Sequence, residues 1–298
     1  MSREILKPRM DVVFKRLMSD KRLLVSFLQS VLDLPPEDYA DVQIVDPHLL
    51  GERPEDKLGI LDVKIVTARK NVVDIEIQLN PIPEMRERAL FYLSSMVTEQ
   101  VRRGEDYHRI KRAICILIFA YEEIHDSTKY HNIYRLHDIE SGSLFSKAME
   151  VHTLELPKLP EQGDETKLCA WLEFIRATKE EEFEMLAQQD PDIGSAVVKL
   201  KELSQDERLR ELAISREKLA WDIASRERGA EERGRAEGRA EGRTEGRAEG
   251  RAEGQDEAQR AIARRMLQRA RPMGEIMEDT GLSLTELQRI QAEGQSRH

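Results

Sequence analysis

The chain has 298 residues, which leaves room for one sizeable domain with appendages or for two small domains. Its 47 basic side chains are outnumbered by 57 acidic ones, so the formal charge is −10, and this excludes a histone-like protein that coats nucleic acid by bulk charge. Charged residues make up 35% of the chain and aromatic residues 5%, a mix that predicts a soluble protein with long charged helices. Contact with DNA would then need a local basic patch.

The first part of the chain alternates between helix and strand patterns. Apolar residues at three- and four-residue spacing predict a helix or helix pair over 12–32, ended by Pro35 and Pro36. A long helix is predicted from Pro83 to Gly104, and further helices over 167–228. The strand signals lie at 42–45, 60–67, 72–79, 113–121, 133–139 and 149–156. The pattern predicts a mixed α/β domain whose sheet is largely complete by residue 156.

Three further features bear on the compartment. Cys115 and Cys169 are far apart in the sequence, which disfavours a disulfide scaffold or a thiolate zinc site and fits a reducing cytoplasm. The longest apolar run, Ala113 to Tyr121, is much shorter than the roughly 20 residues that a membrane helix needs. The opening residues also carry charge where a signal peptide would be apolar. We therefore expect a cytoplasmic protein without a membrane span.

The most informative segment is a predicted β-hairpin that turns around Arg69. In this register Asp62 lies opposite Glu76 and Lys64 lies opposite Asp74, all on one face of the hairpin. The other face is entirely aliphatic and pairs Leu61 with Ile77, Val63 with Ile75, and Ile65 with Val73. A slip of one residue would destroy both faces, so the pattern strongly favours this register.

Two carboxylates held opposite each other repel unless a cation lies between them. Oxygen ligands suit Mg²⁺ or Mn²⁺, so Asp62 and Glu76 are candidate ligands of a divalent metal. Such an ion can activate water and stabilise the charge that develops on a phosphodiester. Gln78 projects to the same face and could orient the water or hold the phosphate. The alternative is a pair of solvent-facing acids on the wet side of a sheet.

Asp62, followed after a turn by Glu76-Ile77-Gln78, resembles the D…(D/E)-x-K core of the PD-(D/E)XK nuclease superfamily. The stretch LDVKIV…DIEIQ resembles the Rpn subfamily, the recombination-promoting nucleases or transposases, as do DVVFK near the start, the helix EMRERALFYLSSMV and the charged tail. The resemblance spans most of the chain. It implies an α/β fold, with a restriction-endonuclease-like mixed sheet core flanked by helices and followed by a long charged helical or coiled tail. The implied activity is a Mg²⁺- or Mn²⁺-dependent DNA endonuclease linked to recombination or mobile elements.

The resemblance also assigns supporting residues. Gln78 stands where the superfamily usually has lysine, as it does in the Rpn subfamily, and Lys64 is a candidate for the missing cation; a modest contact with Asp74 is the alternative. An acid on the first helix can complete the metal site, which points to Asp11, although an ion pair with Lys15 one turn later is the alternative.

DNA contacts are predicted on two helices. Lys15 is a candidate on the first helix, and Arg88 and Tyr92 are candidates on the helix after the hairpin. The alternative for Arg88 and Tyr92 is that their side chains pack on the surface of the helix and do not contact DNA.

Composition changes near residue 228, and we predict four segments. They are a nuclease core over 1–160, a helical extension over 161–228, an R-x-E-G repeat spacer over 229–254 and a C-terminal helical unit over 255–298. A broken apolar stripe from Leu200 to Ile223 resembles a weak coiled coil and predicts a homodimer.

In the repeat spacer each glycine costs about 1 kcal/mol of helix stability relative to alanine, and like charges recur at i, i+4. We therefore expect a flexible or partly helical spacer.

The last segment reads as helix, glycine turn and helix, with Ser283 and Glu286 in the form of a capping box. Five arginines lie shortly before Pro272, so the segment fits two uses: a helix-turn-helix that binds DNA, or a helical hairpin that docks on another protein.

Two functions remain open for the whole chain. One is a DNA-cleaving enzyme, and the other is a catalytically degenerate scaffold that associates with DNA or protein, as the missing lysine would allow.

Overall fold

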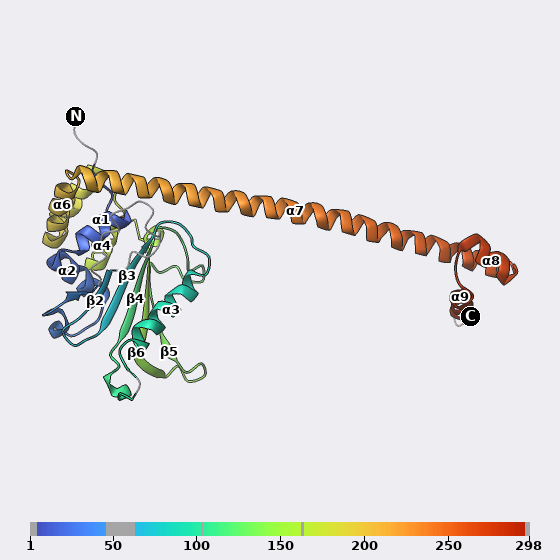
Figure 1. Ribbon diagram of the computed structural model, residues 1–298, viewed down its shortest axis with the longest axis horizontal. Coiled ribbons are helices and arrows are strands. Elements are labelled where there is room, and N and C mark those ends of the chain that lie inside the picture. The colour runs from blue at the N-terminus through green and yellow to red at the C-terminus, as the bar shows by residue number, and fades with distance from the viewer. Residues whose placement is uncertain (1–4, 46–62, 103, 162–163, 296–298) are drawn as a thin grey trace. The chain divides into compact units, whose positions relative to one another are not determined.

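The computed structural model describes residues 5–45, 63–102, 104–161 and 164–295, which form two compact units that divide between Ala224 and Ser225 (Figure 1). The helices are α1 (Asp11–Met18), α2 (Lys21–Val31), α3 (Met85–Thr98), α4 (Lys167–Arg176), α5 (Glu180–Gln189), α6 (Pro191–Leu203), α7 (Glu207–Gln268), α8 (Met273–Thr280) and α9 (Leu284–Gln295). The strands are β1 (Gln43–Ile44), β2 (Val63–Val66), β3 (Val72–Gln78), β4 (Ala113–Phe119), β5 (His131–His137) and β6 (Leu144–Glu155). Short 3₁₀ turns lie at Pro36–Tyr39, Tyr107–Arg109 and Leu156–Lys158.

A six-stranded mixed sheet in the order β1-β2-β3-β4-β6-β5 organises the first unit. The central strands β3, β4 and β6 are parallel, and the outer pairings are antiparallel. Helix α3 covers one face of the sheet, and α1, α2 and α4 to α6 contribute to the core on the other (Figure 1). The mixed α/β prediction is therefore confirmed.

The predicted hairpin register is confirmed wherever both strands are described. Lys64 lies opposite Asp74, and Val63 lies opposite Ile75. The aliphatic face is buried in the main core, as alternation of side chains along a strand requires. Residues 46–62 lie outside the described residues, so the predicted pairing of Asp62 with Glu76 stays a prediction.

The central position of β4 follows from its sequence. All seven of its residues are buried, because β3 and β6 flank it in parallel and helices cover both faces. Alternate side chains of this strand enter the two cores on opposite faces of the sheet.

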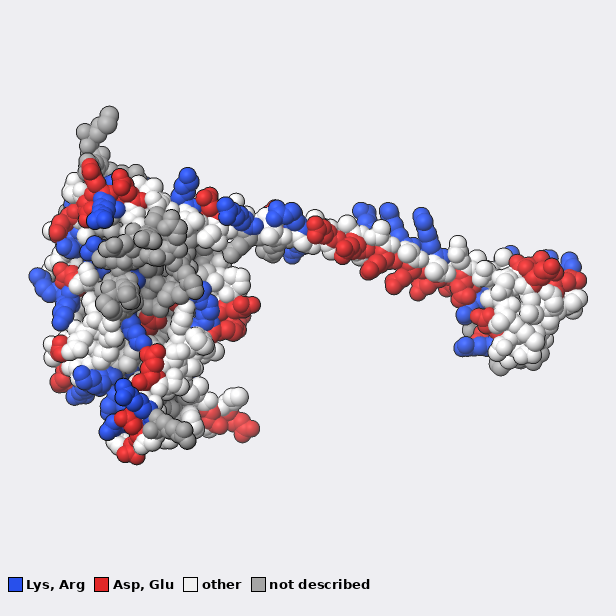
Figure 2. Space-filling view, viewed as in Figure 1, with Lys and Arg blue, Asp and Glu red and all other residues white. Residues whose placement is uncertain are grey.

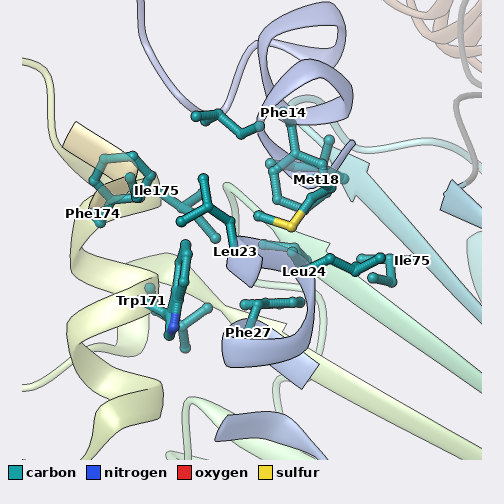
Figure 3. Packing of buried hydrophobic residues seen from close by; sticks show 14 of the residues in the cluster. Phe14, Met18, Leu23, Leu24, Phe27, Ile75, Trp171, Phe174 and Ile175 are labelled. Carbon is teal, nitrogen blue, oxygen red and sulfur yellow. The ribbon is translucent and has the colours of Figure 1, made fainter. Parts of the chain in front are cut away.

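Aromatic side chains join helices α2 and α4 in the main core, which these helices share with the sheet (Figure 3). Phe27 packs edge-on against Trp171 with ring centroids 5.8 Å apart, and Trp171 packs in the same way against Phe174. The Trp171 indole Nε1 donates a hydrogen bond to Ser26 Oγ at 3.2 Å, so its one polar atom is satisfied inside the core. Helices α4 to α6 thus belong to the same hydrophobic core as the sheet, and the predicted boundary at residue 160 does not separate two compact units.

Two predicted helices have different bounds in the structure. The first is a pair, α1 and α2, because Asp20 Oδ1 accepts hydrogen bonds from the backbone of Arg22 and Leu23 and starts a new helix. Helix α3 ends at Thr98 rather than at Gly104. Past its end, the Gln100 side chain accepts a hydrogen bond from the Lys111 backbone at 2.7 Å, which ties the departing chain to the segment before β4.

Of the flexible or partly helical spacer that the repeat predicts, the structure shows the helical form throughout: residues 229–254 lie within one helix, α7. Three of every four residues in the repeat are arginine, alanine or glutamate, which form helices well. The start of α7 is also packed in the core through Leu209 and Ala213, so the cost of nucleating the helix is already met there. The apolar stripe from Leu200 to Ile223 was predicted to form a coiled coil. Its residues Leu200 and Leu209 lie in the core of the first unit, so the first half of the stripe packs within the chain.

The second unit contains α8 and α9 around a small core of its own. Gly281 takes the left-handed conformation, with φ of 70°, and ends α8. The Ser283 backbone donates to Glu286 Oε2 at 2.8 Å, and the Glu286 backbone donates to Ser283 Oγ at 3.3 Å. The predicted capping box and the order helix, glycine turn, helix are confirmed. The two proposed uses of this segment, DNA binding and docking on another protein, stay predictions.

A buried charge network joins β5 to β6. The Glu150 carboxylate accepts hydrogen bonds from Arg112 at 2.8 Å and from Arg135, and it contacts His152 Nε2 at 2.8 Å. His152 Nδ1 lies 2.8 Å from His131 Nε2, with the two rings stacked. Burial opposes the charge on Glu150, but the hydrogen bonds outweigh it and lower its pKa to about 2.

Acid is expected to destabilise the first unit through His131. Burial and the neighbouring His152 lower the pKa of His131 from 6.5 to about 4. The unfolded chain therefore binds more protons between these values, so this contribution is complete above pH 6.5 and is lost as the pH falls toward 4. We expect the free energy of unfolding in urea to fall by about 2 kcal/mol over that window, less than the roughly 3 kcal/mol of a fully buried ring, because His131 is partly exposed and solvent screens its charge. His131→Asn should flatten the profile, and an equal slope in that variant would contradict the assignment.

Within the described part of the chain, none of the helices is both long and apolar enough to span a membrane.

Candidate active site

Strand β3 carries the candidate residues on the face that α3 covers. Because side chains alternate, Asp74, Glu76 and Gln78 project to this face, while the valine and isoleucines between them enter the main core. All three polar side chains are buried, and Glu76 is only 1% exposed. The alternative of solvent-facing acids, made for Asp62 and Glu76, is therefore wrong for Glu76.

Polar groups surround the Glu76 carboxylate. The Gln78 amide donates from Nε2 to Glu76 Oε1 at 2.5 Å. The Arg88 guanidinium, on the first half of α3, lies 3.9 Å from the same oxygen through Nη2. Arg88 also donates to Tyr92 Oη at 2.9 Å and lies 5.8 Å from the centre of that ring. The structure thus brings four predicted residues into one contact network, two from the strand and two from the helix.

Tyr121 belongs to the same neighbourhood, and sequence reasoning did not identify it. Burial raises the pKa of the Tyr121 phenol, and the negative charges of Glu123, Glu76 and Glu155 raise it further. Tyr121 follows β4, the parallel neighbour of β3, so its position just past the carboxyl end of a central strand was the available signal. The phenol stays protonated and can donate a hydrogen bond on this side of the sheet.

Lys64 lies on the same face but contacts another acid. Its Nζ donates to Glu99 Oε2 at 2.7 Å, just past the end of α3; the Lys64 side chain is partly exposed and the Glu99 side chain is exposed. Among the described ion pairs, Arg88 is the cation that approaches Glu76. Lys64 as a catalytic cation stays a prediction.

The first helix places its candidates in different surroundings. Asp11 Oδ2 accepts a hydrogen bond from Arg216 Nη1 of α7 at 3.0 Å, and the Arg216 side chain is only 1% exposed. Asp11 Oδ1 also accepts from the Val12 backbone. Lys15 is only 2% exposed, so its side chain lies in the packed interior of the unit, and its role as a DNA contact stays a prediction. These contacts indicate a structural use for Asp11, and its role as a metal ligand stays a prediction.

The metal site can be judged only in part, because Asp62 lies outside the described residues. Over the described ranges there is no group of three or more His, Cys, Asp or Glu side chains that could hold an ion. The donors that are described, the Glu76 carboxylate and the Gln78 amide oxygen, are hard oxygen ligands of the kind that Mg²⁺ accepts. Since Mg²⁺ commonly takes only one or two carboxylates and keeps several waters, this donor set fits such an ion when Asp62 supplies the second carboxylate.

Comparison with known proteins identified a matching family. The family model described as a PD-(D/E)XK nuclease family transposase matches residues 8–230, which include the whole sheet, α3 and the start of the repeat in α7. No curated protein and no solved structure matches the chain.

Proposed function

Because the chain belongs to the PD-(D/E)XK nuclease family transposases, we propose that it is a metal-dependent DNA endonuclease that hydrolyses phosphodiester bonds in recombination or in mobile elements. The observation that carries the proposal is the buried pair of Glu76 and Gln78 on a central strand, at the position of the family motif. A buried carboxylate with polar neighbours near the carboxyl end of a central strand is a costly arrangement that a catalytic role explains.

In this proposal Asp62 and Glu76 hold Mg²⁺ or Mn²⁺. When bound, such an ion supplies a Lewis acid and an activated water. A half-turn of the Gln78 amide would direct its oxygen toward the ion or its water, in place of the Nε2 that now contacts Glu76. Arg88 lies close enough to Glu76 to balance its charge and could contact a phosphate. It would then supply the positive charge that the motif lysine, which this chain lacks, would otherwise provide.

We also propose DNA as the partner, the cytoplasm as the compartment and a homodimer formed through the C-terminal helical region. Both cysteines are buried, and no disulfide joins them, which supports a reducing compartment. Arg88 and Tyr92 are the DNA contacts that the geometry favours, because both are partly exposed above Glu76.

Cleavage of supercoiled plasmid in a series of Mg²⁺, Mn²⁺ and Ca²⁺ tests the proposal. We expect nicking with Mg²⁺ or Mn²⁺, loss of nicking with chelator, and no nicking by Asp62→Ala at the same melting temperature without metal. Lys111→Ala, a change on the same unit, serves as a purity control. Undiminished nicking by Asp62→Ala would reject the site.

The second candidate is a non-cleaving scaffold that associates with DNA or protein. The observation that favours it is the ion pair of Lys64 with Glu99, which engages the lysine that was the candidate for the missing motif cation. Under this alternative the wild-type protein would neither nick DNA nor gain thermal stability from Mg²⁺ or Mn²⁺.

A further inference from the structure

Three helices contribute to the small core of the second unit. The end of α7 supplies one buried residue, and the others come from α8, from the turn after it and from α9. The buried residues are Ala263, Ile276, Thr280, Leu282, Leu287 and Ile290. Helices α8 and α9 lie beyond residue 230, where the match to the nuclease family ends. The family match therefore assigns no function to this pair of helices.

The turn between α8 and α9 is short and held by hydrogen bonds. Three residues separate the helices, and the first of them, Gly281, has a φ of 70°, which residues with a Cβ atom rarely adopt. The Gly281 backbone donates to Met277 O at 2.9 Å, and the Leu282 backbone donates to Thr280 Oγ1 at 3.4 Å. Two helices joined by a short glycine turn and packed on a third helix have the architecture of helix-turn-helix units that bind DNA.

The side of α9 that points away from the core carries residues suited to contact with base pairs. Leu287 and Ile290 define the buried side of this helix. Since each residue turns an α-helix by about 100°, four residues lie within about 50° of the opposite direction. They are Thr285, Gln288, Arg289 and Ala292, all of which are exposed. Glutamine pairs with adenine and arginine with guanine, and the methyl groups of threonine and alanine suit the methyl group of thymine. We call these four residues the outward face of α9.

The acids of α9 lie to one side of the outward face. Glu286 and Glu293 are about 100° from its centre. Glu286 accepts hydrogen bonds from the backbone and the hydroxyl of Ser283 in the capping box. Glu293 pairs with Arg289 at 3.4 Å and with Arg264 at 4.0 Å. An exposed ion pair of this kind is worth at most about 1 kcal/mol, so Arg289 can exchange Glu293 for a base at little cost.

A basic segment directly precedes α8. Residues 260–271 contain five arginines and no acid. The five are Arg260, Arg264, Arg265, Arg269 and Arg271, and all are exposed. Although the whole chain has a formal charge of −10, this segment supplies the local basic patch that contact with phosphates requires.

The charge of α8 indicates which of the two helices faces DNA. Helix α8 carries Glu275, Glu278 and Asp279, all exposed, and Figure 2 shows acidic side chains gathered over this helix. Phosphates would be repelled there, whereas the outward face of α9 contains no acid. The major groove of DNA admits one α-helix, and α9 is the helix of this pair whose charge suits it.

From this placement we infer that residues 260–295 form a second DNA-binding site, in which α9 enters the major groove and contacts base edges through Gln288 and Arg289. Arg265 and Arg269 contact phosphates. The site does not depend on cleavage, and it gives the chain a sequence preference of its own. A surface that docks on another protein would carry aromatic or large aliphatic residues at its centre, and the outward face of α9 carries none.

Selection from a pool of duplexes with a randomised centre tests the inference. The full-length protein is used with a chelator, so that no strand is cut during the selection. We expect one sequence to be enriched, and the enriched duplex to bind roughly a hundredfold or more tightly than a scrambled duplex of the same composition at the same salt concentration. Equal affinity for the two duplexes would overturn the inference.

Two glutamines of α9 provide a matched comparison. Gln288 belongs to the outward face, whereas Gln291 lies about 110° from its centre, and both are exposed. We expect Gln288→Ala to weaken binding of the enriched duplex roughly tenfold with little effect on the scrambled duplex, and Gln291→Ala to bind like wild type. Arg289→Ala should act as Gln288→Ala does. An unchanged preference in a variant with both changes would contradict the inference and favour docking of α9 on a protein.

Arg265→Gln and Arg269→Gln test the phosphate contacts. Each change should weaken binding of the enriched and the scrambled duplex by the same factor, because phosphates carry no sequence information. Each should also reduce the slope of log affinity against log salt by about 0.9. A slope that stays the same with both changes present would show that these arginines do not contact phosphate, against the inference.

Plasmid nicking distinguishes this site from the proposed nuclease activity. If the wild type binds the enriched duplex through α9 but does not nick DNA with Mg²⁺ or Mn²⁺, the nuclease proposal fails and the second DNA-binding site stands. If the wild type nicks plasmid but enriches no sequence, the nuclease proposal stands and the second site fails.

Discussion

Glu76→Gln is expected to reduce plasmid nicking by roughly a thousandfold, the scale at which removing one electrostatic group from an active site acts. The amide has the shape of the carboxylate, and it can still accept a hydrogen bond from Gln78. It lacks the negative charge that would hold a divalent ion. Because the change neutralises a buried charge, we expect the metal-free melting temperature to stay the same or to rise.

Binding of the metal provides a second measurement for the same variant. A ligand that binds only the native state at a hundred times its Kd stabilises it by about 2.7 kcal/mol. We therefore expect Mg²⁺ or Mn²⁺ to raise the melting temperature of the wild type but not of Glu76→Gln. Glu87→Gln, an exposed acid on α3, is the matched control and should behave as wild type. Wild-type nicking by Glu76→Gln would exclude Glu76 as a ligand.

Asp11→Ala is expected to destabilise the protein by about 3 kcal/mol, because it leaves the buried Arg216 guanidinium without its carboxylate partner on α1. In a unit of this size the melting temperature should fall by roughly 6–12 °C. The loss should be the same with and without metal, and it is measured by urea unfolding. Asp222→Ala, an exposed acid on the same helix as Arg216, is the control and should change stability little.

A double-mutant cycle distinguishes a structural Asp11 from a metal ligand. Replacing both partners, as in Asp11→Ala with Arg216→Met, should cost less than the sum of the single changes, since it removes the buried charge along with its partner. A metal ligand would behave differently. If Asp11→Ala keeps the metal-free melting temperature but loses both the metal-induced rise and nicking, Asp11 completes the metal site and the structural assignment is wrong.

The sequence predicts that the polar side chains of β3 share one face of the strand, but it does not predict which part of the chain covers that face. Alternation places Glu76 and Gln78 on one face, yet a strand pattern cannot tell whether that face meets water or a helix. Helix α3 settles this, because Met85, Ala89 and Leu93 bury the face while Arg88, from the same helix, approaches Glu76. The sequence pattern could not predict the ion pair of Lys64 with Glu99 either, since the two residues are far apart along the chain.

By itself, the sequence determined the elements whose cause is local. Strict alternation fixes the register of β2 and β3, a continuous apolar run makes β4 a central strand, and Ser283 with Glu286 starts α9. Tertiary structure alone decided the features that depend on distant partners. The buried pairing of Asp11 with Arg216 is one of these, and the continuous helix through the repeat, which starts from residues anchored in the core, is another. Local patterns encode which side a residue faces, whereas burial and charge compensation depend on contacts that only the folded chain makes.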